Sequence, residues 1–258
     1  MKWPASITMV RHGRSAYNAL RAVKMKDPLY LRFLKACEED YTSPECRELA
    51  LQVWEKFRLG TGDYDTPLDE IGVEQAFKTG KSMAQDARSP RPDIVLVSPY
   101  LRTRQTWEHM LRGGFNADGA RIIMEDRIRE QEHGLSVLYS DWRVFHVMHQ
   151  EQKLLRELLG PYWYQYPQGE SVSAVRDRTR DVNGMLIREF PELNVCMITH
   201  HLTILSMRAN FERLTPEQFI HLDEHETPIN CGVTRYIGDP AQGVDGKLIL
   251  SEYNTRHY

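Results

Sequence analysis

The segment MVRHGRSAYN gathers two arginines around one histidine. Arg11, His12 and Arg14 follow directly on the apolar run at residues 7–10, where a strand would give way to a turn. Cations on both sides of an imidazole repel one another and lower its pKa, so a bound anion would relieve the repulsion. Guanidinium groups bind carboxylate and phosphate oxygens in pairs. The segment therefore predicts a site for a small anion.

Two other segments carry similar groups directly after apolar runs. The segment SPYLR ends in Arg102, and the segment ITHH ends in the pair His200 and His201. In an open α/β sheet, the ligand crevice lies beyond the carboxyl ends of the strands. If all three runs are strands of one such sheet, Arg102 and His200 face the same edge as the RHG segment. The sequence therefore predicts one site rich in guanidinium and imidazole groups.

Five short runs of apolar and β-branched residues predict buried strands. They are residues 7–10, 94–97, 121–124, 195–199 and 248–250. Helical patterns fill most of the gaps, at residues 72–84, 102–111, 171–190 and 216–222. Strands that alternate with helices are typical of a doubly wound sheet covered on both faces. We therefore expect an α/β fold, a three-layer α/β/α sandwich with a mostly parallel sheet and a helical insertion.

Residues 19–62 interrupt this alternation and form the insertion. The segments LYLRFLKACEE and CRELALQVWEKF read as two amphipathic helices. We expect a single domain over residues 1–258, in which residues 19–62 either close over the ligand as a lid or form a contact in a homodimer. The aromatic stretch at residues 160–167 is either packed against the sheet or a wall that contacts substrate.

Composition narrows the classes of partner. The 33 Lys and Arg against 36 Asp and Glu give a net charge of -3, which argues against a surface built for nucleic acid or anionic membrane. No apolar run approaches the roughly 20 residues that span a bilayer, and the first residues lead into a strand without a signal-peptide core. Cys37, Cys46, Cys196 and Cys231 form no CxxC pair, so neither a disulfide framework nor a zinc knuckle is expected. We therefore expect a cytoplasmic protein whose partner is a small anion.

Four motifs then carry a family resemblance. RHG, SPYLRTRQT, REQEHG and ITHH occur in this order along the chain. Together they resemble the histidine phosphatase superfamily, also called the phosphoglycerate mutase-like family, from about residue 7 to residue 231. Each motif also lies at the structural position predicted for it, which makes the combination far more specific than RHG alone.

The resemblance implies a role for each residue of the phosphate site. His12 is the nucleophile that takes the phosphoryl group, because a neutral imidazole nitrogen can attack phosphorus without a separate base. Gly13 lets the backbone approach the phosphate closely. Arg11 and Arg102 hold the equatorial oxygens, and His200 donates to the charge spread over them.

Further residues match the family pattern around this site. Ser15 and Asn18 occupy the positions of RHGxSxxN that contact the phosphate or the bridging oxygen. Glu130 matches the carboxylate of E-x-x-x-G, which protonates the leaving oxygen and then activates water, and Glu132 is its rival. His201 stands where the family usually has Gly, and we expect its side chain to crowd the phosphate site or tune its charge.

Other polar residues have a simpler interpretation. Arg14 and Arg104 are expected to be solvated or salt-bridged. Glu170, in the segment PQGES, is expected to cap the following helix or to contact the site. His221 and His225 are spaced like a helical metal pair, but a proline interrupts the segment shortly afterwards, so no metal site is expected.

The segment after Gly134 separates two activities within the family. It lacks the YGxLxGLNK-like continuation of the family's mutases. We therefore expect a phosphatase that forms phosphohistidine and releases inorganic phosphate from a small phosphorylated metabolite, with no metal or other cofactor, since two guanidinium groups supply the positive charge. Two alternatives stay open: phosphoryl transfer of the cofactor-dependent phosphoglycerate mutase type, and a non-catalytic member that binds phosphate or a protein. The substrate is not predicted, because loops rather than the phosphate cradle set it.

Overall fold

The computed structural model describes residues 2–258 and divides them into two compact units. The first, which we call the sheet unit, contains the chain up to Ser15 together with residues 67–130 and 174–258. The second, the helical unit, contains residues 16–66 and 131–173. The sequence predicts an insertion at residues 19–62, and the structure adds residues 131–173 to the same helical unit.

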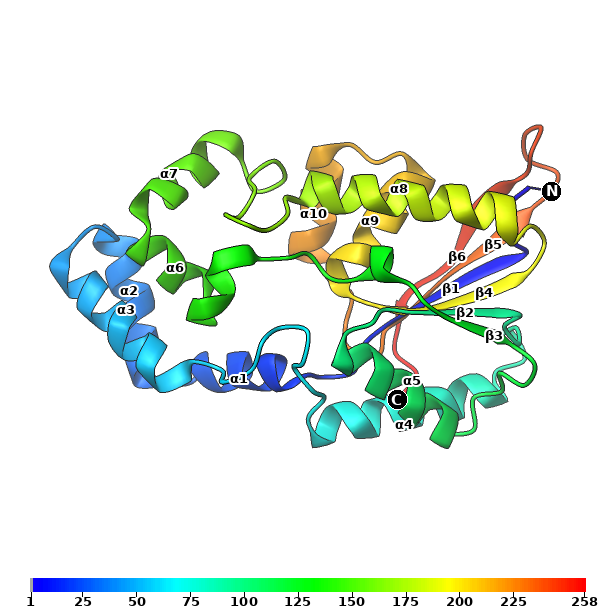
Figure 1. The fold of residues 1–258 in the computed structure, drawn as a ribbon, viewed down its shortest axis with the longest axis horizontal. Helices are drawn as coiled ribbons and strands as arrows, with labels where there is room; N and C mark the ends of the chain where they lie inside the picture. Colours follow the sequence, from blue (N-terminus) through cyan, green and yellow to red (C-terminus); the bar gives the residue numbers. More distant parts are fainter. Residues whose placement is uncertain (1) are drawn as a thin grey trace. The chain divides into compact units, whose positions relative to one another are not determined.

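The sheet unit is built on one sheet with the strand order β3-β2-β4-β1-β5-β6 (Figure 1). Strands β3, β2, β4 and β1 are parallel, while β5 is antiparallel to β1 and β6 is antiparallel to β5. The mostly parallel sheet predicted from the sequence is confirmed. The strand bounds are β1 Ser6–Arg11, β2 Ile94–Val97, β3 Arg121–Met124, β4 Asn194–Thr199, β5 Val233–Asp239 and β6 Lys247–Thr255.

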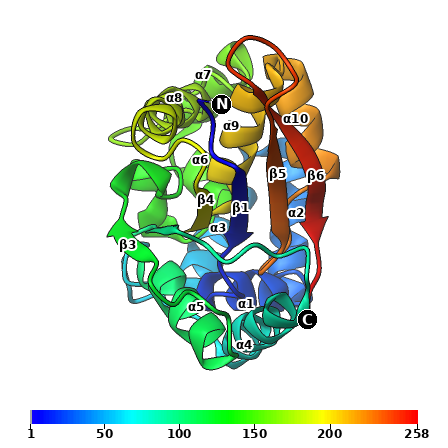
Figure 2. The same cartoon turned by 90° about the vertical axis from the view of Figure 1, so that its right-hand side faces the viewer.

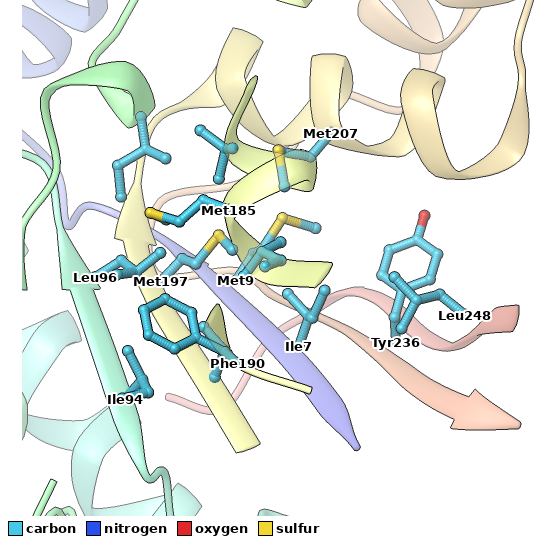
Figure 3. Close-up of a cluster of buried hydrophobic side chains, with 14 of the residues drawn as sticks. Ile7, Met9, Ile94, Leu96, Met185, Phe190, Met197, Met207, Tyr236 and Leu248 are labelled. Atoms are coloured by element: carbon cyan, nitrogen blue, oxygen red, sulfur yellow. The ribbon is translucent and has the colours of Figure 1, made fainter. Parts of the chain in front are cut away.

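Helices cover both faces of this sheet, which confirms the predicted three layers (Figures 1 and 2). Side chains alternate along each strand, so Val10 packs toward α4 and α5 while its neighbour Met9 packs toward α8 and α9. Figure 3 shows the second of these clusters, where methionine side chains from β1, β4, α8 and α9 meet. The helix bounds are α4 Glu70–Gln85, α5 Leu101–Arg112, α8 Val172–Glu189, α9 His201–Glu212 and α10 Pro216–His225, with the 3₁₀ turn η1 at Asp126–Ile128.

Strand β5 and helix α9 are absent from the sequence prediction, and burial explains both omissions. Arg235 stands in the middle of β5 and is 1% exposed, with its guanidinium beside Thr8 and Glu252. A charged residue inside a strand pattern hides the strand from a hydropathy argument. Helix α9 is buried from Leu202 to Ala209, so it lacks the one-sided polar rhythm that marks a surface helix.

The helical unit confirms the two helices expected within residues 19–62. A buried ion pair joins its two sequence segments: Lys24 Nζ lies 2.8 Å from Asp141 Oδ2, which also accepts a hydrogen bond from the Tyr30 hydroxyl at 2.7 Å. None of the helices formed by residues 2–258 combines the length and apolar character that crossing a membrane requires. The bounds are α1 Ala16–Lys24, α2 Pro28–Asp40, α3 Pro44–Phe57, η2 Gly134–Tyr139, α6 Trp142–Met148 and α7 Gln150–Leu159.

Candidate active site

His12 lies directly after β1, and its environment determines which ring nitrogen carries the proton. The imidazole is 3% exposed, and its Nδ1 lies 2.7 Å from the carbonyl oxygen of Gly13. A carbonyl oxygen can only accept a hydrogen bond, so Nδ1 donates and carries the proton of the neutral ring. The lone pair of Nε2 is therefore the one left for chemistry.

Electrostatics keep this imidazole neutral. Burial, followed by the positive charges of Arg102 and Arg11, lowers the pKa of His12 well below its ordinary value. An uncharged ring with an available nitrogen lone pair is the form that can attack phosphorus. The cationic surroundings predicted to repel a proton from His12 are thus present in the structure.

His200 lies directly after β4, the strand that pairs with β1, and its ring centre is 5.2 Å from that of His12. The side chain is fully buried, and its Nε2 lies 2.8 Å from the hydroxyl oxygen of Ser98. Its Nδ1 is buried and has no hydrogen-bond partner among residues 2–258. Burial, then Arg102, His12 and Arg11, lower the pKa of His200, so this imidazole is also neutral at physiological pH.

Two guanidinium groups complete the positive environment. Arg102 lies on the first turn of α5 and is 4% exposed, with its guanidinium carbon 4.8 Å from the ring centre of Tyr100. Arg11 ends β1, and one of its terminal nitrogens donates to the carbonyl oxygen of Pro228 at 2.5 Å. Both charges act on both imidazoles, as the lowered pKa values of His12 and His200 show. The structure therefore brings together the four cationic and imidazole side chains that the sequence placed at three separate strand ends.

The carboxylate of Glu130 lies at the N-terminus of α9, the helix that begins beside His200. Its Oε1 accepts a hydrogen bond from the backbone N–H of Leu202 at 3.2 Å. Arg178, on α8, donates to the carbonyl oxygens of Glu130 at 2.9 Å and of Arg127 at 2.8 Å. These contacts fix Glu130 in the sheet unit, at the N-terminus of α9, which follows directly on His200. Its rival Glu132 is exposed and belongs to the helical unit.

Gly13 is required by packing as well as by its predicted approach to phosphate. A Cβ atom on Gly13 would lie 2.5 Å from the carbonyl oxygen of Gly72, in the first turn of α4. A Cβ atom on Gly72 would in turn lie 2.0 Å from the carbonyl oxygen of Arg14. The backbone N–H of Gly13 donates to Thr106 Oγ1, on α5, at 3.0 Å. Two helices thus fix the turn that carries His12.

The segment Asn230–Gly232 supports the same turn from the other side. The side-chain amide of Asn230 donates to the carbonyl oxygen of His12 at 3.1 Å. The backbone N–H of Cys231 donates to the carbonyl oxygens of Arg11 and His12, at 3.0 and 3.2 Å. The sequence predicts none of these contacts, because the segment Asn-Cys-Gly comes next to the RHG turn only through the pairing of β5 with β1.

Comparison with known proteins identifies the family. The profile of the histidine phosphatase superfamily (branch 1) matches residues 51–241, about three quarters of the chain. The chain belongs to this superfamily. The RHG turn lies before the matched residues, so its place in the site rests on the geometry described above.

Relatives found by sequence comparison are named either as phosphoglycerate mutase-like proteins or as a phosphatase. Phosphoglycerate mutase-like protein AT74H of Arabidopsis thaliana is 29% identical over 63% of this chain and 62% of its own length. Phosphoserine phosphatase 1 of Hydrogenobacter thermophilus is 23% identical over 69% of this chain and 88% of its own length. The chain aligns with 62% and 53% of the lengths of two Arabidopsis thaliana relatives.

Solved structures share the fold along nearly the whole chain. A mycobacterial glucosyl-3-phosphoglycerate phosphatase, in complex with VO3, superposes with a TM-score of 0.62 at 18% identity and covers 98% of this chain and 100% of its own. Alpha-ribazole phosphatase from Shigella flexneri superposes with a TM-score of 0.63 at 15% identity, covering 97% of this chain and 96% of its own. At these identities the likeness establishes the histidine phosphatase fold.

His201 stands where the family resemblance implies a glycine. It opens α9, and its Nε2 lies 2.6 Å from Asp223 Oδ1, on α10. A proton on His201 would lower the pKa of His12, after burial and the two arginines. The ion pair directs the His201 ring toward α10, and its predicted contact with phosphate stays a prediction.

The remaining predicted residues lie in both units. Ser15 is buried in the sheet unit and forms a β-bridge with Leu68, whereas Asn18 lies in α1 of the helical unit. Arg14 forms an ion pair with Asp69, as the sequence suggested, and is thereby fixed beside the start of α4. The roles proposed for Ser15 and Asn18 toward phosphate stay predictions.

The QEHG part of the REQEHG motif and the PQGES motif interlock within the helical unit. The Glu170 carboxylate accepts a hydrogen bond from the backbone N–H of Glu132 at 3.1 Å. Gly134 has a φ of +49°, and a Cβ atom there would lie 2.0 Å from the carbonyl oxygen of Pro167. The glycine of E-x-x-x-G is thus required by backbone packing between the two motifs. The carboxylate of Glu170, considered as a helix cap, is instead bound to this neighbouring segment.

The part of the chain that the structure describes contains no group of three or more His, Cys, Asp or Glu side chains arranged to hold a metal ion. The rings of His221 and His225 stack with their centres 4.5 Å apart, on α10. His225 Nδ1 lies 3.0 Å from the carbonyl oxygen of His221, so one nitrogen of this pair is already bonded to the helix backbone.

Proposed function

We propose that this histidine phosphatase superfamily member hydrolyses small phosphomonoesters through a phosphohistidine intermediate on His12. The observation that carries the proposal is the state of His12: a buried, neutral imidazole with its proton on Nδ1 and a second imidazole 5.2 Å away. This arrangement presents a nucleophilic nitrogen inside a cationic site, which suits attack on a phosphate dianion better than simple binding.

The proposed reaction has two steps. In the first, the lone pair of His12 Nε2 forms a bond to phosphorus, the bond from phosphorus to the ester oxygen breaks, and Glu130 gives its proton to that oxygen. In the second, a water oxygen forms a bond to phosphorus, the bond from phosphorus to His12 Nε2 breaks, Glu130 takes a proton from the water, and inorganic phosphate leaves. Arg11, Arg102 and His200 stabilise the charge on the transferring oxygens, where losing one preorganised donor typically costs about 3 kcal/mol.

The proposal also includes hydrolysis in preference to phosphoryl transfer, and a cytoplasmic location. The segment after Gly134 lacks the continuation seen in the family's mutases, which supports hydrolysis over phosphoryl return. The four cysteines, Cys37, Cys46, Cys196 and Cys231, are free thiols, which supports a cytoplasmic location. Because relatives are named both as mutase-like proteins and as a phosphatase, the decisive experiment must distinguish the two activities.

The test incubates the purified chain with p-nitrophenyl phosphate and, separately, with 3-phosphoglycerate plus its bisphosphate primer, each with and without EDTA. We expect phosphate release that EDTA does not diminish and no isomerised product. His12→Ala should lower phosphate release by about 10³-fold or more. The exposed His225 provides the matched control, and His225→Ala should keep the wild-type rate. Isomerised product would establish the mutase alternative, and equal rates for wild type and His12→Ala would refute the nucleophile.

A second arm of the same experiment tests the acid. Glu130→Gln should lower kcat by about 10²–10⁴-fold for an alkyl phosphate, whose leaving oxygen needs a proton, and by less for p-nitrophenyl phosphate. Glu132→Gln, at the exposed rival position, should leave both rates unchanged. The opposite ranking of the two variants would transfer the role to Glu132.

A further inference from the structure

Ser98, at the end of β2, makes a contact with the second imidazole that the mechanism above does not use. Its side chain is fully buried, and its hydroxyl oxygen lies 2.8 Å from His200 Nε2. The backbone of Ser98 is fixed on both sides, since its N–H donates to Ile198 and its carbonyl oxygen accepts from Thr103 Oγ1 at 2.8 Å. The hydroxyl is therefore presented to the imidazole by a rigid strand end.

The hydrogen bond between Ser98 and His200 has two directions, and only one satisfies every atom. If the hydroxyl donates to Nε2, the proton of neutral His200 resides on Nδ1, a buried atom without a partner among residues 2–258. A phosphoryl oxygen supplies the acceptor that Nδ1–H lacks. If Nε2–H donates instead, the hydroxyl hydrogen has no acceptor among residues 2–258, and the Nδ1 lone pair faces the proposed site of an anion.

We propose that Ser98 is a positioning residue that fixes His200 as its Nδ1–H tautomer, so that Nδ1 donates to the transferring phosphoryl group. This inference rests on the proposed function, because a bound phosphoryl group supplies the acceptor for Nδ1–H, but the tautomer can be measured separately from turnover. The ring of Tyr100 packs against His200 with centres 5.1 Å apart and restricts its rotation. Ser98 supplies the one bond that distinguishes the two nitrogens of that ring.

The spectroscopic test uses the full chain labelled with ¹⁵N-histidine, with the His200 signals assigned by their loss in His200→Gln. We expect the Nδ1 signal of His200 to be that of a protonated nitrogen and the Nε2 signal that of a bare one at neutral pH. In Ser98→Ala the two tautomers should mix or reverse. A wild-type His200 that carries its proton on Nε2 would overturn the proposal, whether or not the enzyme turns over.

The kinetic test compares Ser98→Ala with Ser206→Ala, a fully buried serine on α9 whose hydroxyl has no recorded partner within the described chain. Ser98→Ala should lower kcat for p-nitrophenyl phosphate by about 10–100-fold, less than removal of a whole donor, while KM changes less than about threefold. Ser206→Ala should leave both constants unchanged. Ser98→Cys, which keeps a weak donor, should fall between wild type and Ser98→Ala.

These readouts separate the possible failures. Activity that is lost in His12→Ala but unchanged in Ser98→Ala would reject the role of Ser98 and leave the phosphatase proposal standing. An enzyme without phosphatase activity whose His200 tautomer nevertheless depends on Ser98 would reject the proposed function and leave the positioning role standing. Equal losses in Ser98→Ala and Ser206→Ala would show that the effect is structural and overturn the proposal.

Discussion

The protonation state of His12 is set by its neighbours rather than by its own chemistry. Burial and then the charges of Arg102 and Arg11 lower the pKa of this imidazole. A lowered pKa means that the ring stays neutral as the pH falls below about 6.5, the ordinary pKa of histidine. His12 therefore stays a nucleophile in mild acid, and on the acidic side kcat/KM should fall only when the pH approaches the lowered pKa of His12.

The effect of the Arg102 charge on His12 can be tested by substitution. Replacing Arg102 by Met removes a positive charge beside His12, so a proton binds the ring more readily and its pKa rises. The acidic limb of the kcat/KM profile should move to higher pH, in addition to a loss of rate. The exposed Arg104, on the same helix, is the control, and Arg104→Met should leave the limb in place. A limb that stays unmoved in Arg102→Met would show that the charge of Arg102 does not lower the pKa of His12.

At the scale of elements, the catalytic turn depends on the contact between the end of β1 and the start of α4. Gly13 and Gly72 approach so closely that a Cβ atom on either would lie 2.5 Å or less from a backbone oxygen. Backbone atoms cannot rotate away as a flexible side chain can. The position of α4 is therefore coupled to the position of His12.

Two glycine substitutions in helices test whether α4 holds the RHG turn in place. Gly72→Ala should destabilise the protein by at least about 1–3 kcal/mol and lower kcat, because α4 must shift and the RHG turn with it. Gly184→Ala, in α8, would place its Cβ 3.4 Å from the flexible Arg188 side chain and should stabilise by up to about 1 kcal/mol. Urea unfolding and phosphate release measure both effects. A neutral Gly72→Ala would mean that the turn is not held by α4.

At the scale of the whole molecule, two distant sequence segments must assemble the helical unit. Lys24 and Asp141 provide an ion pair between them, with side chains only 3% and 5% exposed. Lys24 also donates to the carbonyl oxygen of Ser140 at 2.9 Å. Removing one partner of such a pair leaves an uncompensated buried charge, which is far more costly than losing a surface ion pair.

Lys24→Met should therefore lower the free energy of unfolding by about 3–5 kcal/mol. Lys56→Met is the control within the same unit, because Lys56 pairs with Asp27 while remaining 50% exposed, and its loss should cost less than about 1 kcal/mol. Denaturant titration followed by far-UV circular dichroism compares the two. Similar losses for both variants would show that burial of the first pair does not matter to stability.

Local sequence alone was enough to predict most of the sheet, because apolar runs specify buried strands wherever they occur. The runs ending at Val10, Val97 and Thr199 led to the right strands, and the parallel arrangement followed from the helices between them. The same reasoning placed Arg11, His12, Arg102 and His200 at one sheet edge. It failed at β5, since Arg235 finds its partners on β1 and β6, which no local pattern reveals.

Only the tertiary structure determines the protonation state and the orientation of these residues. The proton of His12 is assigned by the Gly13 carbonyl and its pKa by burial, while His200 is oriented by Ser98, 102 positions earlier in the chain. The partnership of residues 16–66 with 131–173 likewise depends on a buried pair 117 positions apart. Periodicity reports which side of an element is buried, but hydrogen bonds and charges act over a few ångströms between groups that only the folded chain brings together.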